Sequence, residues 1–216
     1  MDIVSFVIFI SVLIFSVVLH EVSHGAVAYK LGDNTAKMMG RLTLNPLPHI
    51  DLLGSIIVPL VMAIPALFGG PAIIFGWAKP VPYNPYNLRY KKWGPALVGI
   101  AGPATNISLA VVAGLLIRLF PQVIYDPNLL GAGLVLFVVA YLNIILAIFN
   151  LVPIPPLDGS KLLFSLFPLS AQTKYFLERN GFLFLLLFIF FGFQLIVPII
   201  RFLFTFITGI DISAAL

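Results

Sequence analysis

Two histidines and a glutamate stand together in a stretch that is otherwise apolar, in the order His20-Glu21-Val22-Ser23-His24. In a helix, residues four apart lie on one face, so both imidazoles can reach a single zinc ion. Glu21 lies about 100° round the helix axis from His20 and can act on a metal-bound water molecule. This spacing is typical of metalloproteases. The alternative is a cluster of hydrogen-bonded polar side chains that holds helices together, but such a cluster does not need this spacing.

The setting of the motif favours a functional role. Seventeen residues of almost pure hydrocarbon character precede His20. Ionisable groups inside an apolar span cost several kcal/mol to insert and are by default functional.

Two histidines leave a zinc site one protein ligand short, because catalytic sites take three and keep the fourth position for water. The chain has no cysteine, which excludes thiolate ligands, iron–sulfur clusters, disulfides and a cysteine nucleophile. A third ligand must therefore be a histidine or a carboxylate. Four candidates are interpreted as solvated loop residues: Asp33, His49, Asp51 and Asp126.

Asp158 is a different candidate, because it follows Asn150-Leu151-Val152-Pro153-Ile154-Pro155-Pro156-Leu157. Three prolines in four positions forbid a regular helix, and irregular backbone near membrane depth needs a reason. Asp158 can also be an N-cap for a helix from Gly159 to Phe167, a role that does not exclude metal binding. Asn150 either ends a helix or donates to a developing oxyanion.

Composition identifies the class of protein that carries these residues. The 216 residues are 61% hydrophobic and 9% charged, with a mean hydropathy of +1.10. Soluble domains average about 25% charged residues. We therefore expect an integral membrane protein. The net charge of +4 comes from basic residues in short clusters between apolar runs, so nucleic-acid binding is not expected.

Four apolar runs are long enough to cross a bilayer core of about 30 Å as helices. They predict an all-α membrane protein formed by one domain over residues 1–216, and the first run has no cleavage site of a removable signal peptide. The runs are Ile3 to Tyr29, Trp93 to Phe120, Leu129 to Asn150 and Gly181 to Thr208.

A fifth apolar run, residues 52–75, contains prolines and a Gly-Gly-Pro sequence and makes a poor continuous span. If it dips into the membrane and returns, ten of the twelve Lys and Arg residues lie on one side, as the positive-inside rule asks. We therefore interpret it as re-entrant, with a fifth full span as the alternative. The partly alternating residues 38–48 predict a small strand-like hairpin.

Three motifs together resemble the site-2 protease family of intramembrane zinc metalloproteases, in its compact prokaryotic branch. They are the His20–His24 motif, Ala101-Gly102-Pro103-Ala104-Thr105-Asn106 and the segment from Asn150 to Gly159. The resemblance implies that His20, His24 and Asp158 bind one zinc ion per chain and that Glu21 is the catalytic carboxylate. It associates Asn150 with substrate or transition-state contact. No PDZ or CBS domain is expected, and Asn106 and Gly102-Pro103 are interpreted as packing residues.

The expected function is hydrolysis of peptide bonds in single-span membrane protein substrates, with zinc-bound water activated by Glu21 attacking an unwound segment. The expected location is the cell membrane, with the active site nearer the cytosolic face. Two alternatives remain: a divalent-metal transporter, which needs polar ligands at several depths, and a non-catalytic zinc-binding protein, in which Glu21 has no use.

Overall fold

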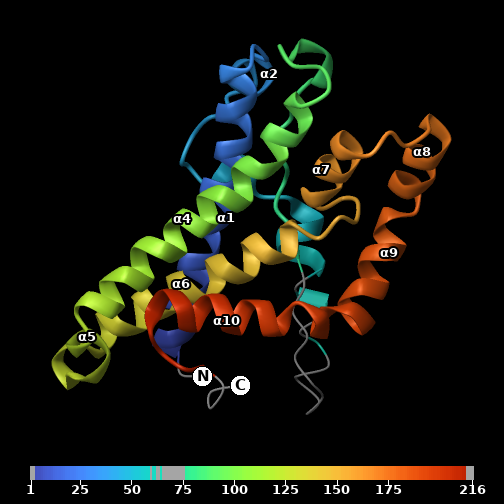
Figure 1. Ribbon diagram of the computed structural model, residues 1–216. Helices are drawn as coiled ribbons and strands as arrows, with labels where there is room; N and C mark the ends of the chain where they lie inside the picture. The colour runs from blue at the N-terminus through green and yellow to red at the C-terminus, as the bar shows by residue number, and fades with distance from the viewer. Residues whose placement is uncertain (1–2, 59, 62–63, 65–75, 213–216) are drawn as a thin grey trace.

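The computed structural model describes residues 3–58, 60–61, 64 and 76–212 (Figure 1). Within these ranges the regular structure is helical and no residue is in a β-strand. Three helices are long and apolar enough to cross a membrane. They are α1 (Ile3–Lys30), α4 (Gly94–Leu119) and α6 (Leu130–Asn150), and each bound lies within one residue of the span expected from the sequence.

Shorter helices follow or connect these three. The described ones are α2 (Thr35–Met38), α5 (Gln122–Tyr125), α7 (Gly159–Leu166), α8 (Ala171–Arg179), α9 (Gly181–Leu187) and α10 (Val197–Thr208), with a π-helical turn at Leu52–Ile57. Figure 1 shows α1 crossed by α4 and α6, with α8 and α9 set to one side and α10 running beneath.

Helices α1 and α4 pack closely and run antiparallel. His24 contacts Val98 near the start of α4, whereas His20, one turn earlier in α1, lies against Gly102, one turn later in α4. Small residues allow helices to approach in a membrane, where no hydrophobic driving force draws them together. The glycines of α4 therefore permit the contact that places the two histidines.

The continuous span expected from Gly181 to Thr208 is interrupted in the structure. A π-helical turn at Phe188–Gly192 and a 3₁₀ turn at Phe193–Leu195 separate α9 from α10. Pro198 lies in the first turn of α10, where its missing N–H and ring prevent continuation of the preceding helix. A fourth span is present only if α8 and the stretch Gly181–Leu195, bent by 59° to each other, count as one.

Helix α10 instead packs on α4 and α6. Phe204 is fully buried and contacts the rings of Phe137 and Tyr141 in α6. Gly114 of α4 comes close to Ile207 of α10. This apolar cluster joins α10 to α4 and α6, and Val152 of the loop that follows α6 also packs against it.

The strand-like hairpin expected at residues 38–48 is not found; this segment forms bends and turns. Gly40 has a φ of +66°, a left-handed conformation that ends the preceding helix. Thr43 Oγ1 and Asn45 Oδ1 each accept a hydrogen bond from a backbone N–H two residues on. Such local side-chain bonds compete with strand pairing.

The re-entrant prediction for residues 52–75 lies largely outside the described residues, but both flanks of the run are described. The backbone N–H of Trp77 donates to Gly54 O at 3.1 Å, and that of Arg89 donates to Leu31 O at 2.8 Å. The residues before and after the undescribed part of this run therefore lie next to each other. The path between these flanks lies outside the described residues, so the re-entrant interpretation stays a prediction.

Candidate metal centre

His20, His24 and Asp158 meet at one point. Nε2 of each imidazole lies 3.0 Å from the same carboxylate oxygen, Asp158 Oδ2. The two rings are 4.7 Å apart and nearly perpendicular. All three side chains are buried. The helical spacing brings the histidines together, and the loop after α6 brings the carboxylate from 138 residues away.

The hydrogen bond at Nδ1 of His24, the ring nitrogen that faces away from Asp158, sets the tautomer of this histidine. Nδ1 lies 2.6 Å from the carbonyl oxygen of Val98, which can only accept, so Nδ1 carries the proton. Nε2 is then unprotonated and has a lone pair to offer a metal.

Asp158 stands at the position before α7, but its side chain caps no N–H group of that helix. The N-cap alternative is therefore wrong: the carboxylate faces the histidines. Gly159 makes the loop possible, because a Cβ there would lie 2.2 Å from Leu151 O, where the loop folds back on its own start.

The second oxygen of Asp158 is held by a cation. Lys161 Nζ donates to Asp158 Oδ1 at 2.7 Å, one turn along α7. This pairing orients the carboxylate so that Oδ2 faces the imidazoles. This pairing was not predicted from the sequence, although the position of a lysine three residues after Asp158 was a signal for it.

Helix α4 forms a wall of the site. A Cβ on Gly102 would lie 2.5 Å from His20 Nε2 and 2.6 Å from His24 Nε2, and one on Gly99 would lie 3.1 Å from Asp158 O. Gly102, interpreted from the sequence as a packing residue, thus packs against the ligand nitrogens themselves.

Glu21 is half-buried on the neighbouring face of α1. Its Oε2 accepts a hydrogen bond of 2.7 Å from the backbone N–H of Val81. Val81 belongs to an extended segment whose carbonyls at Lys79 and Pro80 accept from Arg41 Nη2. The sequence carried no signal for this backbone contact.

Asn150 is not part of the cluster: its Nδ2 donates to Leu146 O of its own helix at 2.9 Å. The four other candidates also lie outside the cluster. Asp51 and Asp126 cap short helical turns and are partly exposed. His49 and Asp33 are buried rather than solvated. His49 Nε2 donates to Thr43 O, and Asp33 accepts from Thr35, Asn84 and Asn87.

The donor set fits zinc. The three ligand atoms all lie within 4.8 Å of one another. Zinc at about 2.0–2.2 Å from each nitrogen and oxygen places tetrahedral ligand atoms about 3.3 Å apart. Two neutral imidazoles and one carboxylate are the ligands of a catalytic site that keeps a position open.

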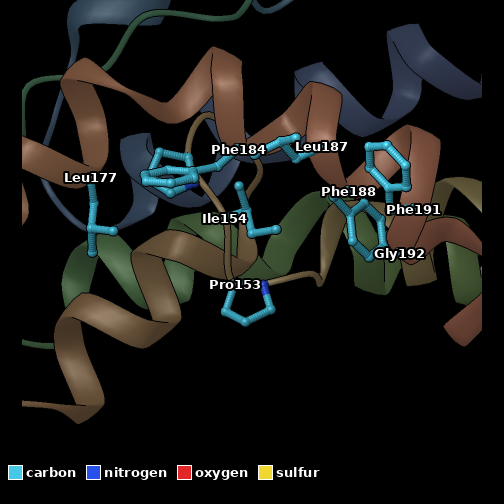
Figure 2. Close-up of a pocket in the computed structure, with 9 residues that line it drawn as sticks. Pro153, Ile154, Leu177, Phe184, Leu187, Phe188, Phe191 and Gly192 are labelled. Atoms are coloured by element: carbon cyan, nitrogen blue, oxygen red, sulfur yellow. The ribbon is translucent and has the colours of Figure 1, made fainter.

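Two cavities flank the proline-rich loop that carries Asp158. One, of about 430 Å³, is apolar; Figure 2 shows Pro153 and Ile154 of the loop on one side and phenylalanines of α9 and the following turn on the other. The other, of about 520 Å³, is more polar than the first, and its lining includes Ser160, Lys161, Lys174 and Glu178. Pro155 borders both cavities.

The profile of Peptidase family M50 matches residues 126–188. "Putative zinc metalloprotease YwhC" of Bacillus subtilis is 40% identical over 184 residues, 82% of this chain and 78% of that protein. "Putative zinc metalloprotease Rip2" of Mycolicibacterium smegmatis is 31% identical over 156 residues, 71% of this chain and 55% of that protein. No solved structure matches. The chain belongs to peptidase family M50, the site-2 proteases, and is a zinc metalloprotease of the membrane.

Proposed function

We propose that this protein hydrolyses peptide bonds of single-span membrane proteins at a zinc site held by His20, His24 and Asp158. The observation that carries the proposal is the shared oxygen Asp158 Oδ2, 3.0 Å from both Nε2 atoms and buried between helices. A zinc ion bound there would polarise the scissile carbonyl and lower the pKa of its bound water towards about 7.

Glu21 is the proton-transferring carboxylate in this proposal. It takes the proton of the attacking water and delivers it to the leaving amine. The N–H of Val81 holds Oε2, so the carboxylate has a fixed direction and Oε1 is the oxygen that handles protons. Lys161 keeps Asp158 oriented throughout.

The two cavities offer separate routes for the two reactants. The apolar groove beside Pro153 and Ile154 suits a membrane-embedded substrate segment. The more polar cavity beside Ser160 and Lys161 suits water. The substrate segment must unwind, because the hydrogen bonds of a helix shield its peptide bonds. Asn150 could contact that segment through Oδ1 or its second Nδ2 hydrogen, since Leu146 O takes only one Nδ2 hydrogen.

The depth of the site agrees with cleavage inside the bilayer. His24 is six residues from Lys30, about 9 Å along the helix, and His20 is ten residues away, about 15 Å. The metal then lies within the hydrocarbon, nearer the side that carries most basic residues. By the positive-inside rule this is the cytosolic side of the cell membrane.

The proposal is tested in proteoliposomes that contain a labelled transmembrane peptide and a zinc-sensitive dye. The native protein is expected to cut the peptide without moving zinc across the bilayer, and the Glu21→Gln protein is expected to do neither. Zinc flux without cleavage would identify a transporter instead. If zinc-containing protein neither cuts any of a panel of peptides nor moves zinc, the result would favour a non-catalytic zinc-binding protein.

A further inference from the structure

A layer of buried polar side chains lies one helical turn from the candidate metal centre. Ser16, Asn106 and Asn143 come from α1, α4 and α6 and are at most 3% exposed. Asn143 Nδ2 donates to Ser16 Oγ at 2.8 Å and to Val139 O at 2.9 Å. Asn106 is fully buried, and neither atom of its amide has a partner. A buried amide without hydrogen bonds is costly, so this one needs a reason.

Other unpartnered atoms belong to the same region. His20 Nδ1 and Asn143 Oδ1 are also buried without a hydrogen bond. If Nε2 of His20 binds zinc, its Nδ1 must carry a proton and be a donor. The set then contains two donors, His20 Nδ1 and Asn106 Nδ2, and two acceptors, Asn106 Oδ1 and Asn143 Oδ1. Donors and acceptors match in number.

The antiparallel register of α1 and α4 places these groups at one depth. His24 lies against Val98 and His20 against Gly102. One turn further, Ser16 precedes His20 by four residues and Asn106 follows Gly102 by four. Side chains tilt towards the N-terminus of their own helix. The imidazole of His20 therefore tilts towards the level of Ser16, and the amide of Asn106 tilts back towards Gly102, so the two converge.

Nδ1 of His24 has a hydrogen-bond acceptor, whereas Nδ1 of His20 has none. Metal-binding histidines almost always donate their second ring N–H to a carbonyl, a carboxylate or a water molecule. His24 has the carbonyl of Val98 for this purpose. The turn of α4 that follows Gly102 carries an unused acceptor, Asn106 Oδ1.

We propose that Asn106 is a positioning residue for His20. Its Oδ1 accepts the Nδ1 proton of His20, directly or through one buried water molecule, and its Nδ2 donates in the same way to Asn143 Oδ1. The bond fixes the tautomer that leaves Nε2 free for the metal and holds the plane of the ring. This role rests on the proposed zinc site and adds a third transmembrane helix to its support.

The test measures zinc affinity of the full chain in detergent by competition with a chromogenic chelator. Asn106→Leu removes both polar atoms at similar size, and Asn106→Val does so with less volume in case leucine does not fit. Both are expected to bind zinc about 10- to 100-fold more weakly. Asn106→Asp keeps an acceptor and is expected to stay within about threefold of the native protein. Thr105→Val is the control, because its hydroxyl bonds only to Ala101 O of the same helix.

The thermal unfolding midpoint of each metal-free protein separates positioning from packing. A packing role for Asn106 lowers the midpoint of the apolar variants, leaves zinc affinity unchanged and is not rescued by aspartate. The inference would be overturned if both apolar variants bound zinc as tightly as Thr105→Val, or if Asn106→Asp bound zinc as weakly as Asn106→Leu. Either result would leave the proposed zinc site standing. Failure of the native protein to bind zinc would overturn the metal site and this inference with it.

Discussion

The backbone N–H of Val81 donates a hydrogen bond of 2.7 Å to Glu21 Oε2. This contact joins α1 to a segment 60 residues later in the chain, which is itself held at Lys79. Arg41 Nη2 donates to Lys79 O, and the N–H of Lys79 donates to His49 O. The direction of the proposed catalytic carboxylate is therefore set by the backbone of a loop.

Val81→Pro removes this donor. Pro80 and Pro82 flank the position, so the backbone there is already suited to proline. Loss of a hydrogen bond to a carboxylate is expected to lower kcat about 10- to 100-fold, with zinc content unchanged. Val81→Ala keeps the N–H and is the control. Equal kcat in the two variants, measured on a labelled transmembrane peptide, would show that the contact does not orient Glu21.

Gly102→Ala is expected to disrupt the metal centre without removing a ligand. The added Cβ would lie 2.5–2.6 Å from both Nε2 atoms, so the rings must move. We expect zinc affinity to fall at least about tenfold in chelator competition, as it does when the groups that orient ligands are lost. Gly131→Ala is the matched control, because nothing lies within 4 Å of its added Cβ. Native affinity in the Gly102→Ala protein would mean that α4 does not confine the site.

The parts of the site that the sequence predicts are local. The pairing of His20 with His24 follows from helical periodicity, and the spans α1, α4 and α6 follow from the length of their apolar runs. The meeting of Asp158 with the histidines depends on how the loop after α6 folds back over Gly159. The resemblance to the family implied that Asp158 joins the two histidines, whereas its position in the sequence alone did not decide this.

Other features depend on tertiary contacts that no local pattern records. Asp33 looked like a solvated turn residue, but it is buried because its carboxylate accepts hydrogen bonds from Asn84 and Asn87, about 50 residues later in the chain. Asn106 was interpreted as a packing residue, and its small neighbours in the sequence give no indication of the positioning role proposed for it. The break after α9 was missed because the apolar run continues through it.

Asp33 predicts a pH dependence of stability. Burial by itself raises the pKa of this carboxyl, but hydrogen bonds from Thr35, Asn87 and Asn84 outweigh burial and hold the pKa below its ordinary value of 3.8. The unfolded chain therefore takes up the proton first as pH falls. The stabilisation is complete above about pH 4–5 and is lost as pH falls below 3.8. Unfolding midpoints in detergent should fall more steeply with acid for the native protein than for Asp33→Asn, and parallel curves would contradict this role.

Membrane sidedness can be measured with single cysteines, since the native chain has none. We expect cysteines at Asn34, Tyr86 and Thr173, all exposed positions, to react with an impermeant thiol reagent from the cytosolic side. A cysteine at Asn128 is expected to react from the opposite side. Reaction of Tyr86→Cys together with Asn128→Cys, and not with Asn34→Cys, would show that residues 52–75 cross the membrane.

The central claim is that His20, His24 and Asp158 hold the metal while Glu21 moves protons. Its most direct test is zinc content per chain, measured by atomic emission beside peptide cleavage. We expect about one zinc ion and no turnover in Glu21→Gln, and loss of both zinc and turnover in His20→Ala, His24→Ala and Asp158→Asn. His49→Ala, which removes a buried histidine outside the cluster, is expected to keep its zinc. Zinc retained by Asp158→Asn but lost from His49→Ala, or turnover by Glu21→Gln equal to that of the native protein, would contradict the account.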